Sequence, residues 1–129
     1  MSGNGLSRQV APVLLSLLWA ASGHAAPPDD ETIGLLMVSA LQADSFSAIC
    51  DQRDSKPATG RALEALARWP KQQAEARTLA DSTYPELVND LKPLIEEAGG
   101  CAIAKLRQLR NDSVREFDVR LAELKALPE

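Results

Sequence analysis

The amino-acid sequence predicts an all-α protein, a single small domain of about five helices arranged like a helix bundle. Three observations lead to this prediction. Apolar residues recur at helical spacing in several segments. No segment alternates β-branched and polar residues between turn signals, as a half-buried strand would. Two cysteines, Cys50 and Cys101, follow an apolar N-terminal segment and are placed to close the domain with one disulfide.

The N-terminal segment has the layout of a secretory signal peptide. Arg8 precedes an apolar run over residues 10–21, and small residues follow the run. The run is shorter than the about 20 residues that a membrane-spanning helix needs. We therefore predict a cleavable leader over residues 1–25, a mature domain over residues 26–129 and no permanent membrane anchor. A protein with such a leader is periplasmic or secreted.

His24 is the only histidine in the chain. Cleavage after Ala25, or after Ala26 as the alternative, removes it with the leader. The mature protein then lacks an imidazole for a Ser-His-Asp or Cys-His nucleophile and for histidine-ligated zinc or haem. The glycine patterns of nucleotide-binding loops are also absent from the sequence. The sequence therefore predicts no cofactor and no metal, and it favours a protein that is not an enzyme.

The chain is acidic and poor in aromatic residues. It has 14 basic and 18 acidic residues, and removal of Arg8 with the leader widens this difference. An acidic surface repels phosphate backbones and anionic lipids, so nucleic acid and anionic membrane surfaces are excluded as partners.

Export would place both cysteines in an oxidising compartment, where paired cysteines of a small domain form a disulfide. Cys50 and Cys101 are far apart in the sequence, unlike the C-x-x-C spacing of redox-active pairs, which indicates a structural bond. The bond would join the end of the first predicted helix to the start of the last one. That connection fits antiparallel packing of these two helices.

Local signals divide the mature chain into elements. These elements are a helix over residues 31–50, a loop over 52–60, a helix over 61–69, a surface helix over 71–80, an amphipathic helix over 84–98 and a last helix from 101 to about 127. Asp30 is placed to cap the first helix, and residues 44–45 are a candidate interruption of it. Pro57 and Gly60 are helix breakers in the loop, and Pro70 ends the second helix.

The first helix is apolar nearly all the way round over residues 33–41. At 100° per residue one face carries Ile33, Leu36, Met37 and Ala40. Leu35 and Val38 lie on the other face. A helix with two apolar faces is usually central in a bundle, and the alternative is that its second face meets a partner.

Capping and breaking residues bound the later helices. Thr83 and Glu86 have the spacing of a capping box that opens the amphipathic helix. Pro93 predicts a kink in that helix or its division into two short helices, and Gly99 with Gly100 predicts its C-terminal end. The last helix has an apolar face made of Ile103, Leu106, Val114, Phe117, Leu121 and Leu124.

Two arginines of the last helix, Arg107 and Arg110, are the candidate polar contacts. If the helix is straight, both lie beside its apolar face and could bind a carboxylate or phosphate group on a ligand or a partner. The alternative is a break near Asp112, favoured by a second capping box that begins at Ser113. Arg110 would then move to the flank of the helix, where it either pairs with an acid or extends its charged end to solvent.

Trp69 and Tyr84 are the aromatic residues best suited to anchor a protein partner, because such residues dominate interface hot spots. The alternative for both is a place in the core. No catalytic residue is predicted.

The leading functional hypothesis is a small exported protein that acts by protein–protein binding, such as an inhibitor, an immunity-type protein or an adaptor of the bacterial periplasm. Its partner would be a protein of the cell envelope. One alternative is a small anionic-ligand binder or a histidine-independent enzyme that uses Arg107 and Arg110. Another is a structural subunit that associates with copies of itself through the first helix.

Overall fold

The computed structural model describes residues 26–128, so the predicted leader and His24 lie outside the described residues. Within this range the chain forms four α-helices, one short 3-10 helix and no strand. The elements are α2 (Asp30–Cys50), α3 (Pro57–Ala65), η1 (Leu66–Arg68), α4 (Pro70–Ala98) and α5 (Ala104–Lys125). The predicted all-α class is confirmed, and the helix number is close to the five expected.

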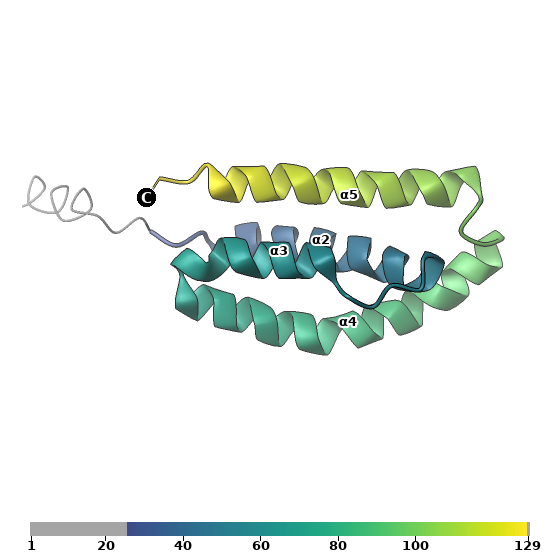
Figure 1. Cartoon of the computed structure of the whole chain (residues 1–129), viewed down its shortest axis with the longest axis horizontal. Helices are drawn as coiled ribbons and strands as arrows, with labels where there is room; N and C mark the ends of the chain where they lie inside the picture. Colours follow the sequence, from purple (N-terminus) through teal and green to yellow (C-terminus); the bar gives the residue numbers. More distant parts are fainter. Residues whose placement is uncertain (1–25, 129) are drawn as a thin grey trace, which may run out of the picture.

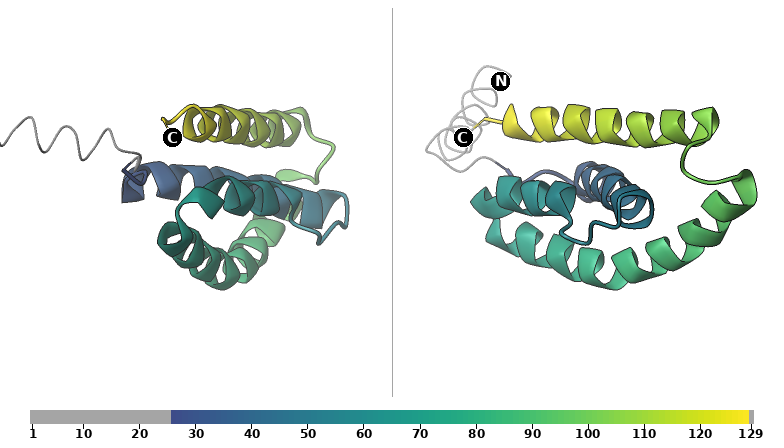
Figure 2. Two further views of the ribbon diagram at one scale, coloured as in Figure 1. Left: turned by 60° about the vertical axis from the view of Figure 1, so that its left-hand side comes forward. Right: turned by 45° about the vertical axis from the view of Figure 1, so that its right-hand side comes forward.

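Helix α2 is the centre of the bundle, because it packs against each of the other three α-helices. In Figure 1, α3 lies in front of α2, α5 runs along the top and α4 along the bottom. Figure 2 shows the same arrangement from two other sides. Helices α2 and α5 are antiparallel, as predicted for the first and last helices.

Helix α2 begins with a side-chain cap and continues without interruption to Cys50. Asp29, rather than Asp30, is the cap: its carboxylate accepts a hydrogen bond of 2.8 Å from the Thr32 amide, which lowers the pKa of Asp29. The expected interruption at residues 44–45 was wrong. The Ser45 hydroxyl donates to the Leu41 carbonyl within the helix. The Asp44 carboxylate accepts hydrogen bonds from backbone amides of a neighbouring helix.

Asp44 stabilises the start of α3 at Pro57, within the segment predicted as a loop. Its carboxylate is 2% exposed and accepts hydrogen bonds from the amides of Ala58 (3.0 Å) and Thr59 (2.7 Å). A buried anion thus binds the first free amides of α3, where the helix dipole favours negative charge. Gly60, expected to break a helix, lies inside α3.

Helix α4 is continuous over the two helices predicted at 71–80 and 84–98, so the capping box at Thr83 does not open a helix. Pro85 and Pro93 both lie within it and are exposed. On the solvent side, a proline leaves a carbonyl that water can bind, and it bends the helix away from itself. Two prolines on this side therefore curve α4 around the core, as Figure 2 shows.

Helix α5 is also continuous, so the break expected as an alternative near Asp112 is absent. The Ser113 hydroxyl donates to the Leu109 carbonyl one turn earlier and caps nothing. Gly99 and Gly100 end α4 as predicted: both have left-handed backbone angles, and the Gly100 amide donates to the Ile95 carbonyl.

Two hydrophobic clusters fill the bundle. The larger lies among α2, α3, α4 and α5 and includes Phe117, which the sequence assigned to the core. The smaller cluster consists of Phe46, Ile95 and Leu106, with both cysteines packed against it. Of the apolar face predicted for the last helix, Ile103 and Val114 are exposed instead of buried.

Helix α2 is long and apolar enough, by length and composition alone, to cross a membrane. However, 56% of its most apolar stretch is buried inside the bundle, as expected for a core helix.

Candidate functional site

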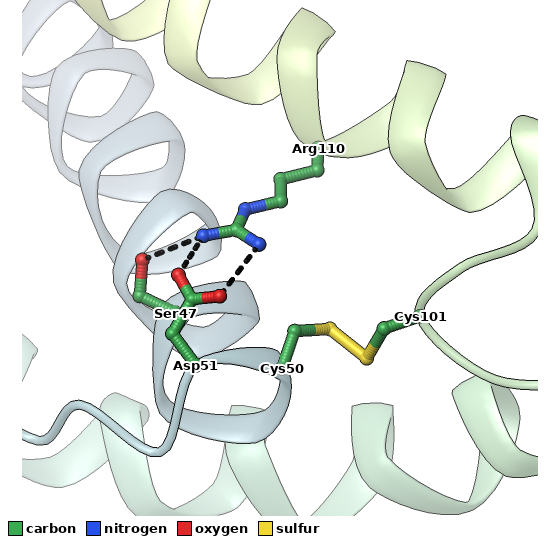
Figure 3. A network of polar contacts seen from close by, with 5 residues as sticks. All are labelled: Ser47, Cys50, Asp51, Cys101 and Arg110. Carbon is green, nitrogen blue, oxygen red and sulfur yellow. Dashed lines mark hydrogen bonds and ion pairs between the residues drawn. A yellow bond between two sulfur atoms is a disulfide. The ribbon is translucent and has the colours of Figure 1, made fainter.

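The predicted disulfide is present. It joins Cys50, the last residue of α2, to Cys101 in the turn before α5, with the two Cα atoms 5.7 Å apart. Figure 3 shows the bond beside a polar contact that links the same two helices. This end of the bundle is therefore held covalently as well as by packing.

Arg110 of α5 forms that polar contact. Its guanidinium donates to both carboxylate oxygens of Asp51 and, over 3.4 Å, to the Ser47 hydroxyl (Figure 3). The hydrogen bonds from Arg110 to Asp51 hold the pKa of Asp51 below its ordinary value, because they favour the charged carboxylate. Arg110 thus pairs with an acid, as the second account of the sequence expected, although α5 does not break.

Arg107 lies in different surroundings. It is exposed on α5, beside Asn111 and Arg115, and borders a shallow hollow on the solvent side of that helix. The structure therefore does not bring Arg107 and Arg110 together around one anion.

Trp69 and Tyr84 lie in the core, the alternative that the sequence left open, and are 7% and 6% exposed. The Arg68 guanidinium lies 4.4 Å from the centre of the Trp69 ring system. The Tyr84 hydroxyl donates to Asp54 over 3.0 Å, and the Lys56 ammonium lies 4.6 Å from the Tyr84 ring centre. Tyr84 therefore ties the loop before α3 to α4.

The surroundings of Tyr84 predict how its ionisation and the stability of the fold depend on pH. Burial, and then the hydrogen bond to Asp54, raise the pKa of Tyr84 from 10.0 to about 12. The folded chain keeps this proton to a higher pH than the unfolded chain, so stability falls as pH rises from 10 towards 12. Because Tyr84 is the only tyrosine, the phenolate absorbance reports on it alone.

We expect a phenolate midpoint near pH 12 in the folded protein, lowered towards 10 by Asp54→Asn. Circular dichroism at each pH verifies that the chain is still folded. A midpoint of about 10 in the folded wild type would contradict the burial of the Tyr84 hydroxyl and its hydrogen bond to Asp54.

One side of α2 remains uncovered by the other helices. Its exposed residues after the first turn, Leu35, Val38 and Gln42, follow one another at helical spacing. Leu35 is 40% and Val38 50% exposed. Asp44, which binds α3, lies on nearly the opposite side of the helix, so this stripe faces away from α3.

A groove between α2 and α4 adjoins this stripe. Ile33 and Gly34 line it from α2, and Ala76 and the exposed Leu79 line it from α4. Gly34 lies one turn before Val38 and thus connects the groove to the stripe. We call Gly34, Leu35, Val38 and Leu79 the α2 face. The sequence showed that Leu35 and Val38 lie apart from the first face of the helix, but not that they would stay uncovered.

Comparisons of this chain with protein-family models, curated proteins and solved structures found no match. Within residues 26–128, no three His, Cys, Asp or Glu side chains are placed together to hold a metal ion. The function is therefore inferred from the surface of this chain.

Proposed function

We propose that the protein acts in the cell envelope by binding another protein through the α2 face. The observation that carries this proposal is the exposure of Leu35 and Val38 on the helix that forms the centre of the core. Single exposed apolar residues are ordinary on protein surfaces. Apolar side chains that are adjacent in space, and that continue into a groove, are typical of an interaction site.

Export is part of the proposal. The apolar segment at the N-terminus and the disulfide are both compatible with an exported protein, periplasmic or secreted. An inhibitor, an immunity-type protein or an adaptor would each act by such binding. The anion-binding alternative has less support, because Asp51 already occupies Arg110.

The proposal predicts that Val38→Asp abolishes capture of a partner while Val119→Asp does not. Val119 is a matched control, because it is the same residue type and is 47% exposed, against 50% for Val38. It lies on the side of α5 away from the buried Phe117. The measurement is affinity purification of the exported protein after mild crosslinking, with thermal unfolding to verify that both variants fold.

We expect wild type and Val119→Asp to retain the same partner and Val38→Asp to lose at least about 90% of it, since a charge buried in an apolar contact is costly. Equal retention by both variants, or no partner with the wild type, would refute the proposed function.

A further inference from the structure

Neither the backbone conformation nor a close contact within the described part of this chain requires a glycine at position 34. Gly34 lies inside α2, where glycine destabilises a helix relative to alanine. It has an ordinary helical backbone, and a Cβ atom added there would meet nothing within 4 Å apart from its chain neighbours and the backbone of α2 itself. The missing side chain instead leaves the backbone open at the groove, where a second backbone could approach closely.

Acidic residues line the groove and continue along α2 and α4 beside the α2 face. Asp30 and Glu75 line the groove, and Glu31 lies one turn before Leu35. Along α4, Glu86 and Asp90 follow Leu79 by 7 and 11 positions, which places them on the same side of the helix. All five acids are exposed.

Within residues 26–128, basic residues do not balance these acids. On α4, Arg77 and Lys92 lie on the side opposite Leu79, and Lys71 lies at its flank. On α5, Arg120 is close enough to Glu31 for the two charges to interact, but its guanidinium already binds Glu116 and Glu123 at 2.8 and 3.6 Å. The border of the α2 face is therefore negative.

The negative charge around the α2 face favours one of three possible binding partners. A second copy of the chain would bring two acidic borders together, and an anionic lipid surface would be repelled. A partner with apolar side chains flanked by lysine or arginine would satisfy both the apolar and the charged parts of the surface. A helix fits the shape, because the groove runs along two helices and Gly34 allows close approach.

We infer that the α2 face binds a basic amphipathic helix of another protein, an inference that rests on the proposed function.

The test uses synthetic helical peptides against the full mature domain. The probe has a leucine stripe flanked by lysines, and two controls replace each lysine by glutamate or scramble the sequence. We expect the basic peptide to bind at least about tenfold tighter than either control, and less tightly as salt increases. Fluorescence anisotropy measures the affinities.

Variants of the domain locate the contact. Glu75→Lys is expected to weaken binding of the basic peptide about tenfold, whereas Glu64→Lys, the same charge change on the exposed surface of α3, leaves it nearly unchanged.

Gly34→Gln places a side chain in the groove and is expected to weaken binding about tenfold without loss of thermal stability. Gly60→Gln, in α3, is its matched control.

Other outcomes separate the two proposals. If the acidic or the scrambled peptide binds as tightly as the basic peptide, the partner is not a basic helix. The same conclusion follows if Glu75→Lys and Glu64→Lys change the affinity for the basic peptide equally. Dimers, or adsorption to anionic vesicles, that disappear with Val38→Asp would overturn it in favour of a second copy or a lipid surface. If Val38→Asp still fails to capture the partner protein in any of these cases, the proposed binding function stands. Only the inference that the partner presents a basic amphipathic helix is then wrong.

Discussion

The double variant Cys50→Ala with Cys101→Ala is expected to unfold with a free energy lower by about 4 kcal/mol. The disulfide closes a loop of 51 positions, and the chain-entropy model assigns about this stabilisation to a loop of that length. The end of the bundle that it holds has a small core of three buried residues, Phe46, Ile95 and Leu106. Little packing therefore compensates for its loss. Urea denaturation of the oxidised, reduced and substituted proteins measures the difference.

Arg110→Ala is the control for this prediction. It removes the ion pair with Asp51 at the same end of the bundle but leaves the disulfide intact. Because this pair is only partly buried, its removal is expected to cost less than about 1 kcal/mol. If the double cysteine variant loses no more than Arg110→Ala, the disulfide is not the principal constraint on this end.

Asp44→Ala is expected to lower the free energy of unfolding by about 3 kcal/mol. The substitution leaves the amides of Ala58 and Thr59 buried without their acceptor, and each hydrogen bond to a charged group contributes about 1.5–3 kcal/mol. The loss is expected to be largest in α3, because the carboxylate binds the first turn of that helix. Urea denaturation gives the total, and hydrogen exchange locates the loss at residues 57–65.

Asp29→Ala is the matched control, since Asp29 caps α2 with an exposed carboxylate. An ordinary exposed cap contributes about 1 kcal/mol. A loss for Asp44→Ala no greater than that for Asp29→Ala would show that burial adds nothing to the contact between α2 and α3.

The sequence predicted those features of the fold that depend on neighbouring residues. Gly99 and Gly100 end α4 because glycine adopts left-handed angles at low cost, whatever surrounds it. The disulfide joins residues 51 positions apart, yet it could be predicted, because the chain has only two cysteines and a predicted leader for export. A bond between Cys50 and Cys101 then fixes which helix ends meet, and this predicted the antiparallel packing of the first and last helices.

Helix boundaries that depend on distant residues were predicted wrongly. Asp44 caps a helix that begins 13 positions later, and no local pattern shows such a contact. The division of α4 into helices over 71–80 and 84–98 was wrong, whereas the kink predicted at Pro93 as the alternative to a break agrees with a continuous, curved helix (Figure 2). In each of these cases, packing between helices outweighed the preference of the local sequence.

The candidate site was less predictable than the fold. Arg110 and Tyr84 have the residue types of binding sites, yet here Asp51 and Asp54 occupy their polar groups. Leu35 and Val38 have the residue types of a core, yet the other helices leave them exposed. Periodicity shows that α2 has two apolar faces, but three neighbouring helices decide which face is covered.

The affinity of the proposed partner, once it has been captured by crosslinking, for Val38→Asp and Val119→Asp tests the role of the α2 face most directly. We predict that Val38→Asp binds at least about tenfold more weakly than wild type and that Val119→Asp binds as wild type does. Equal affinities of the two variants would contradict the α2 face as the binding surface.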